Sequence, residues 1–167
     1  MRLPAPRSER EHMRASPDSR ADGPKVMRIL ITDDHEISRA AVRALLRTEG
    51  LNVIADLRTD GGVLAAAHAL RPDVVIIDVT PATGTGLAIA RRLRALPTPP
   101  IVILTSSADR AQFGPCVNGY LFIAKADLSA AAIASLASAP DCADRTLGSL
   151  DPAAARNYST CRAQIQL

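Results

Sequence analysis

Five short apolar runs, separated by stretches with a helical period, constrain the fold of this chain most strongly. The runs occupy residues 28–32, 52–57, 73–78, 101–105 and 120–124. Because polar residues do not alternate within them, they predict strands that are covered on both faces, as in a parallel sheet. The helical stretches occupy residues 36–48, 61–70, 86–96 and 128–138. This alternation predicts an α/β fold, a doubly wound five-stranded parallel sheet with right-handed crossovers.

Two segments carry more specific expectations. In residues 36–48, the apolar period predicts a core-facing side made of Ile37, Ala41, Ala44, Leu45 and Thr48. Between the fourth and fifth predicted strands, Gly114-Pro115 and Asn118-Gly119 leave room for barely two helical turns. We therefore expect a short fourth helix that is partly a loop.

Composition and charge limit the size and surface of the folded part. The chain has 167 residues, which suits one domain, and with two Tyr, two Phe and no Trp its core must be built from Ala, Val, Ile and Leu. The formal net charge is +3, and residues 27–139 hold 11 Lys or Arg against 10 Asp or Glu. We therefore expect no nucleic-acid-binding surface on this core.

The two ends of the chain lack a sustained apolar period. Residues 1–26 combine Arg and Pro without a hydrophobic centre, which predicts a disordered leader rather than a secretory signal. Met27 offers an alternative start of translation, which would place this leader upstream of the true start. Residues 140–167 predict a largely disordered tail. A segment this short cannot form a helix-turn-helix output domain.

The cysteine pattern and the hydropathy indicate in which cellular compartment the protein is located. Cys116, Cys142 and Cys161 are odd in number and widely spaced, which fits neither a disulfide framework nor a metal site. No apolar run approaches the roughly 18 residues that a membrane helix needs. We therefore expect reduced thiols in a cytoplasmic protein.

Acidic residues follow two of the predicted strands. In "ILITDDHEIS", residues 29–38, a strand runs directly into Asp33 and Asp34, and Asp78 ends the third strand. Ligands of open parallel sheets bind outside the carboxyl ends of the strands, so these carboxylates share one pocket if the first and third strands are neighbours. Adjacent carboxylates repel each other unless a cation lies between them. The pattern therefore predicts a divalent-cation site, with His35 facing solvent because Mg²⁺ prefers oxygen ligands.

Two further strand ends carry residues suited to phosphoryl transfer. Thr105 ends the fourth predicted strand, and Lys125, one of only two lysines, follows the fifth. A carboxylate can attack a phosphoryl donor, and an ammonium and a hydroxyl can donate to phosphoryl oxygens. We expect Asp33 and Asp34 to hold Mg²⁺, and Asp78 both to ligate the metal and to attack. Lys125 and Thr105 would contact the phosphoryl oxygens.

The motifs "ITDDHEISR", "PDVVIIDVTPATGTGL", "IVILTSS" and "IAKADLS" occur in this order along the chain. In their order and placement they resemble the response regulator receiver domains of bacterial two-component systems, over residues 27–138. The resemblance implies the flavodoxin-like strand order 2-1-3-4-5. It also implies Asp78 as the phosphoacceptor, with Asp33, Asp34 and the backbone carbonyl of Thr80 as the remaining protein ligands of Mg²⁺.

The resemblance assigns three more residues. It implies Thr105 as the switch hydroxyl and Lys125 as the lysine of the acceptor site. Phe122 falls where the family has an aromatic residue that changes rotamer on activation, and Tyr120 is the less favoured occupant. The chain departs from the family at Pro81-Ala82, where receivers commonly have Met-Pro. The short fourth helix also departs, so partner choice and dimer mode do not carry over.

The expected function is a stand-alone receiver, residues 27–139, rather than an enzyme. It would take a phosphoryl group from a histidine kinase or a phosphotransfer protein, dephosphorylate itself slowly at most, and signal by protein–protein contact with a downstream protein that the sequence does not identify. Whether it forms a homodimer stays open. The alternative is a pseudo-receiver that binds partners without phosphorylation. An aspartyl-nucleophile hydrolase would need an Asp-x-Asp motif, and a nucleotide binder a Gly-rich loop, where this chain has "TDDHE".

Overall fold

The computed structural model describes residues 26–138 and contains a five-stranded parallel sheet in the order β2-β1-β3-β4-β5. The strands are β1 (Arg28–Thr32), β2 (Asn52–Leu57), β3 (Val74–Asp78), β4 (Ile101–Ser106) and β5 (Leu121–Ala124). The helices are α1 (Glu36–Thr48), α2 (Gly62–Leu70), α3 (Thr85–Arg94) and α4 (Ala130–Ala137), with 3₁₀ segments η1 (Arg110–Val117) and η2 (Lys125–Asp127). The predicted fold class and strand order are confirmed.

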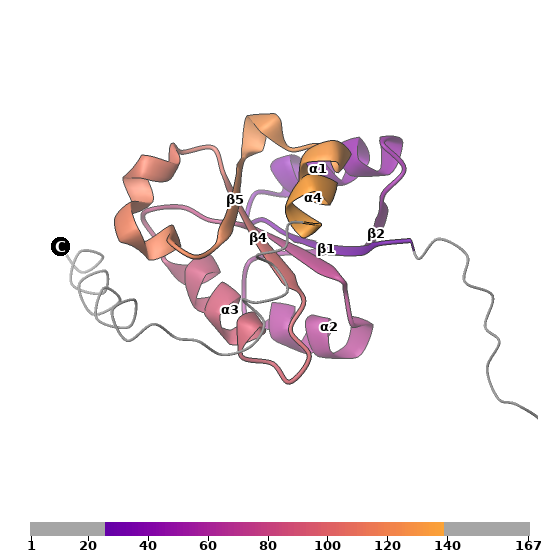
Figure 1. Cartoon of the computed structure of the whole chain (residues 1–167), viewed down its shortest axis with the longest axis horizontal. Helices are drawn as coiled ribbons and strands as arrows, with labels where there is room; N and C mark the ends of the chain where they lie inside the picture. Colours follow the sequence, from indigo (N-terminus) through magenta and orange to yellow (C-terminus); the bar gives the residue numbers. More distant parts are fainter. Residues whose placement is uncertain (1–25, 139–167) are drawn as a thin grey trace, which may run out of the picture.

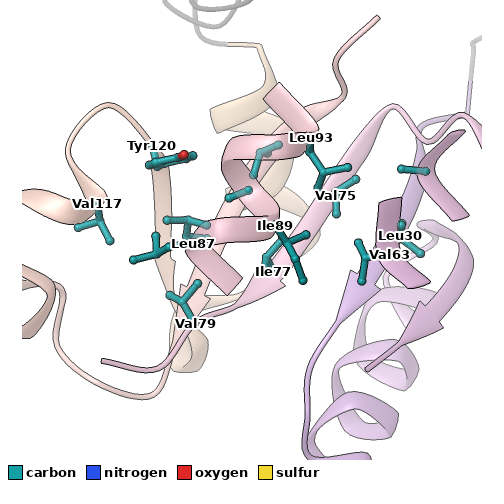
Figure 2. Packing of buried hydrophobic residues seen from close by; sticks show 14 of the residues in the cluster. Leu30, Val63, Val75, Ile77, Val79, Leu87, Ile89, Leu93, Val117 and Tyr120 are labelled. Carbon is teal, nitrogen blue, oxygen red and sulfur yellow. The ribbon is translucent and has the colours of Figure 1, made fainter. Parts of the chain in front are cut away.

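The helices cover the sheet in pairs. Figure 1 shows α1 and α4 on one face and α2 and α3 on the other. Between α2, α3 and the sheet lies an apolar cluster to which Leu93 and Tyr120 also belong, shown in Figure 2. All five residues of the central strand β3 are buried. This burial on both faces explains why the strands read as continuous apolar runs.

The buried side of α1 differs from the predicted one. The five residues expected to face the core are all exposed: Ile37, Ala41, Ala44, Leu45 and Thr48. The side chain of Ile37 is 88% exposed and that of Leu45 is 41% exposed. The buried residues of α1 are instead Val42 and Leu46, so this prediction was wrong.

Ion pairs between α1 and β2 account for that orientation. Arg39 and Arg43 lie on the same i, i+3, i+4, i+7 stripe as the two buried residues. Their guanidinium groups contact the carboxylate of Asp56 in β2 at 3.3 Å and 2.9 Å. Because these arginines have an acidic partner on the edge strand, the side of the helix that carries them turns toward the sheet.

The segment between β4 and β5 is irregular, as expected. It forms η1 instead of a regular α-helix, and Gly114 interrupts it with a φ of 53° and a ψ of −141°. Glycine accepts this left-handed backbone without steric cost, and Pro115 follows with no N–H to donate. The prediction of a short, partly loop-like helix between the fourth and fifth strands is therefore confirmed.

The predictions on the compartment have different outcomes. Cys116, the one cysteine within residues 26–138, is disulfide-bonded, so the expectation of a reduced thiol is wrong at this position. Spacing along the chain cannot reveal which thiols a fold brings together. None of the helices within 26–138 combines the length and apolarity needed to cross a membrane. The cytoplasmic location stays a prediction, and the predictions for residues 1–25 and 139–167 lie outside the described residues.

Candidate functional site

The topology brings the predicted strand-end residues to one edge of the sheet. β1 and β3 are neighbours, so Asp33, directly after β1, lies beside Asp78, the last residue of β3. Thr105 of β4 pairs with Asp78 in the sheet register. Lys125 begins η2 immediately after β5. Four residues from four strand ends therefore share one side of the molecule, as ligand sites of open parallel sheets do.

Lys125 connects the two buried carboxylates. Its ammonium nitrogen lies 2.6 Å from Oδ1 of Asp78 and 2.9 Å from Oδ2 of Asp33. The side chains of Asp33, Asp78 and Lys125 are 2%, 8% and 18% exposed. An ion-pair network this poorly solvated is weakly screened by salt, so each charge depends on its partners.

Asp33 is surrounded by hydrogen-bond donors. Ser38 donates its hydroxyl to Oδ2 at 2.6 Å, and the backbone N–H of His35 donates to Oδ1 at 2.8 Å. Burial works to raise the pKa of Asp33, but the hydrogen bonds from Ser38, Lys125 and His35 outweigh it and the pKa is lowered. Asp33 therefore stays ionised at neutral pH.

At Asp78 burial prevails instead, and the pKa shifts in the opposite direction. Burial raises the pKa of the Asp78 carboxyl, Lys125 works to lower that pKa, and the charge of Asp33 raises it further, with a net upward shift. Burial works to lower the pKa of Lys125, but its contacts with Asp78 and Asp33 prevail and the pKa is raised. The lysine is therefore a fixed positive charge in the pocket.

Asp34 and Thr80 lie differently from the three central residues. Asp34 is exposed, and its Oδ1 accepts the backbone N–H of Thr59 at 3.1 Å. Thr80 is exposed as well, and its hydroxyl is 3.0 Å from that of Thr83. Among residues 26–138, no group of three or more His, Cys, Asp or Glu side chains is arranged to hold a metal ion.

The chemistry of the donors nevertheless fits Mg²⁺. The predicted ligands are carboxylate oxygens of Asp33, Asp34 and Asp78 and the carbonyl oxygen of Thr80, and carboxylates, carbonyl groups and waters are the oxygen ligands that suit Mg²⁺. Asp34 is exposed and therefore accessible to an ion from solvent. His35 is 81% exposed and its Nδ1 is 3.9 Å from Oδ1 of Asp33, which places it at the rim.

Thr105 holds an unused donor on β4, next to β3. The residue is 3% exposed, and in the described part of the chain its Oγ1 is the only buried side-chain nitrogen or oxygen without a hydrogen-bond partner. An unpartnered buried hydroxyl costs stability. A ligand oxygen arriving beside Asp78 would satisfy it.

The aromatic residue Phe122 lies in a packed but incompletely buried position on β5. Its ring is 5.8 Å from that of Phe113, which is buried in η1. The guanidinium carbon of Arg110 lies 5.7 Å from the centre of the Phe122 ring. Tyr120 is buried instead, beneath the guanidinium of Arg94.

Sequence reasoning missed two residues of this site. Ser38 contacts Asp33 and Lys125, and Thr59 contacts Asp34 through its backbone. Ser38 lies five residues after Asp33 and is the third residue of α1, and its closeness to the acidic pair in the sequence is the only signal that points to it. A backbone N–H leaves no signal in the sequence at all.

Comparison with known proteins identifies the family. The response regulator receiver domain family matches residues 29–127. The chain belongs to this family. The signal receiver domain of NarL from Mycobacterium tuberculosis has the same fold as this receiver domain, with a TM-score of 0.59 and 26% identity over 70% of this chain and 99% of that one. Residues 29–127 thus form the receiver domain of a two-component response regulator, a class of generally non-enzymatic signalling domain.

Two curated relatives are longer proteins. The DNA-binding transcriptional activator EvgA of Escherichia coli (strain K12) is 32% identical over 88 residues, which are 53% of this chain and 43% of EvgA. A protein-glutamate methylesterase/protein-glutamine glutaminase of Anaeromyxobacter dehalogenans is 35% identical over 107 residues, 63% of this chain and 31% of that protein. This receiver domain therefore spans less than half the length of each relative.

Proposed function

We propose that this receiver domain accepts a phosphoryl group on Asp78 from the phosphohistidine of a histidine kinase or of a phosphotransfer protein. The observation that carries the proposal is the convergence of Asp33, Asp78 and Lys125 within hydrogen-bonding distance at one edge of the sheet. In the transfer, the bond between phosphorus and histidine nitrogen breaks and a bond from phosphorus to a carboxylate oxygen of Asp78 forms.

In this proposal Asp33, Asp34, Asp78 and the carbonyl oxygen of Thr80 hold Mg²⁺. When bound, the ion would neutralise charge on the phosphoryl oxygens, which is the usual contribution of a metal in phosphoryl transfer. To bind the ion, Asp34 would have to give up the hydrogen bond that it accepts from the backbone N–H of Thr59.

The chain's own residues do the rest. Asp78 supplies the attacking oxygen, and its low exposure keeps water from competing for the acyl phosphate. Lys125 turns its N–H from the carboxylate of Asp78 to a phosphoryl oxygen. Thr105 donates the hydroxyl that is otherwise unpartnered. In this proposal the ring of Phe122, which contacts Phe113 of η1, then changes rotamer, and the change at η1 and β5 signals the phosphorylated state.

For the output we propose protein–protein contact rather than nucleic-acid binding by the core. The nearly balanced charge of residues 27–139 supports this, although the relative EvgA is a DNA-binding activator. Duplex binding by a 27–139 fragment at micromolar affinity, weakened by added salt, would contradict the proposal.

One observation favours the alternative, a pseudo-receiver that binds partners without phosphorylation. Lys125 engages both buried carboxylates and Asp34 is bonded to Thr59, so all three carboxylates already have partners, and among residues 26–138 no group of acidic side chains is arranged to hold an ion. In that case the same ion-pair network would serve only to fix the loops at this edge of the sheet.

Phosphate-affinity electrophoresis distinguishes the two functions. The folded protein is incubated with acetyl phosphate, with Mg²⁺ or with a chelator in excess. We expect the wild type to show a retarded band with Mg²⁺ and no retarded band with excess chelator. Asp78→Asn should show no retarded band under either condition, because its amide is a poor nucleophile of similar shape. A wild-type protein that shows no retarded band would favour the pseudo-receiver, and a band that survives in Asp78→Asn would mean another acceptor.

A further inference from the structure

The ammonium group of Lys125 has a third partner besides the two carboxylates. Its Nζ donates to Oγ of Ser38 at 3.1 Å, in addition to Asp33 and Asp78. An ammonium has three N–H groups and no acceptor. All three donors of the lysine are therefore used, and one of the three acceptors is a neutral hydroxyl.

Ser38 connects the lysine to Asp33 through its hydroxyl. It is the third residue of α1 and is half-buried. Its Oγ accepts from Lys125 and donates to Oδ2 of Asp33 at 2.6 Å. A hydroxyl can donate one hydrogen bond and accept two, so this geometry uses its donor fully. Lys125, Asp33 and Ser38 thus form a closed triangle of hydrogen bonds.

We infer that Ser38 is a positioning residue for phosphoryl acceptance, which holds Lys125 in place while the lysine exchanges Asp78 for the incoming phosphoryl group. The inference rests on the proposed function. When a carboxylate oxygen of Asp78 is used to bond phosphorus, its contact with the ammonium weakens. Ser38 and Asp33 retain two of the three N–H groups, so the third swings over a short arc to a phosphoryl oxygen.

Without the hydroxyl of Ser38, the lysine would be held by Asp33 alone during that exchange. One hydrogen bond fixes neither the direction of the ammonium nor that of its free N–H, and positioned charges contribute to transfer only when they are fixed beforehand. The expected loss is the value of one hydrogen bond to a charged group, about tenfold in the rate constant of phosphorylation.

Four variants test the inference. Ser38→Ala and Ser38→Val remove the hydroxyl, and Ser38→Thr keeps it with nearly the shape of valine. Thr48→Ala is a matched control, because Thr48 lies on the same helix and its hydroxyl donates only to the backbone carbonyl of Ala44. Each folded protein is mixed with acetyl phosphate and Mg²⁺, and the rate constant of phosphorylation is measured by intact-mass spectrometry, alongside the unfolding temperature.

We expect Ser38→Ala and Ser38→Val to be phosphorylated about tenfold more slowly than wild type, and Ser38→Thr and Thr48→Ala within about twofold of it. Equal rates in wild type and Ser38→Ala would overturn the inference and leave the proposed function intact. A loss in Ser38→Thr equal to that in Ser38→Val would also overturn it, since shape rather than the hydroxyl would then matter. A wild type that is not phosphorylated would overturn the proposed function, and this inference with it.

Discussion

The ammonium nitrogen of Lys125, directly after β5, lies 2.6 Å from the carboxylate of Asp78 at the end of β3, so the lysine reaches across the end of β4. The same ammonium contacts Asp33 after β1. Three of the five strands, β1, β3 and β5, are thereby linked at one edge by a single cation. The network that we propose for phosphoryl acceptance is therefore also part of what holds the folded state together.

Removing the charge of Lys125 should destabilise the protein in the absence of metal. Lys125→Met leaves two poorly solvated carboxylates facing each other, and we expect a loss of about 3 kcal/mol in the free energy of unfolding. Adding Asp78→Asn to this variant should recover part of the loss, because one of the two unpaired charges is then gone. Urea unfolding in the presence of a chelator measures the free energy of unfolding of the single and the double variant. A Lys125→Met variant as stable as wild type would mean that solvent already screens the pair.

The contribution of Lys125 to stability should disappear at high pH. The folded-state pKa of Lys125 is raised above its ordinary value of 10.5, so its stabilisation is fully present below that value and is lost as pH rises through the folded pKa. Unfolding free energies measured between about pH 9 and pH 12 should therefore fall more steeply for wild type than for Lys125→Met. Parallel curves for the two proteins would show that the lysine gains nothing from its partners on folding.

Gly86 should tolerate no side chain. A Cβ at this position would lie 2.8 Å from the backbone carbonyl oxygen of Asp78 and 2.8 Å from Cγ1 of Val79. Gly86→Ala must therefore push α3 away from the end of β3, and we expect a loss of roughly 1–3 kcal/mol in unfolding free energy together with slower phosphorylation. At Gly61 a Cβ would have no atom within 4 Å, so Gly61→Ala is the control and should be nearly neutral. Equal stability of the two variants would contradict the close approach.

Residues 27–139 should fold without the flanking segments. All five strands and the helices that cover them lie within residues 26–138, and the two apolar clusters consist of residues from this range. We expect the fragment to unfold in one cooperative transition, with a midpoint close to that of the full chain measured in reducing agent, where the disulfide of Cys116 is open. Loss of cooperative unfolding on removal of residues 1–26 or 140–167 would assign the removed segment to the core.

The sequence predicted the strands better than the orientation of the helices. The strands match the apolar runs to within one residue at each end, because central parallel strands are buried on both faces and need no choice of side. α1 required such a choice, and Ile37 and Leu45 favoured the wrong side. The deciding contacts join Arg39 and Arg43 to Asp56, on another element, and helical periodicity holds no information about them.

The same limit applies to the site. Asp33 and Asp78 could be placed together because strand ends converge in a parallel sheet, and Lys125 because it follows the last strand. The hydroxyl of Ser38 could not, because its role depends on where the lysine ammonium comes to rest, far away in the sequence. Residues that hold other residues in place are visible only once the fold has brought their partners together.

The central claim is that Asp78 accepts a phosphoryl group, and intact-mass spectrometry followed by peptide mapping tests it most directly. Wild type incubated with acetyl phosphate and Mg²⁺ should gain the mass of one phosphoryl group, on the peptide that contains Asp78, and Asp78→Asn treated identically should gain none. Excess chelator should prevent the gain in wild type. An unchanged mass of folded wild type under a donor that phosphorylates a control receiver, or an equal gain in Asp78→Asn, would contradict the claim.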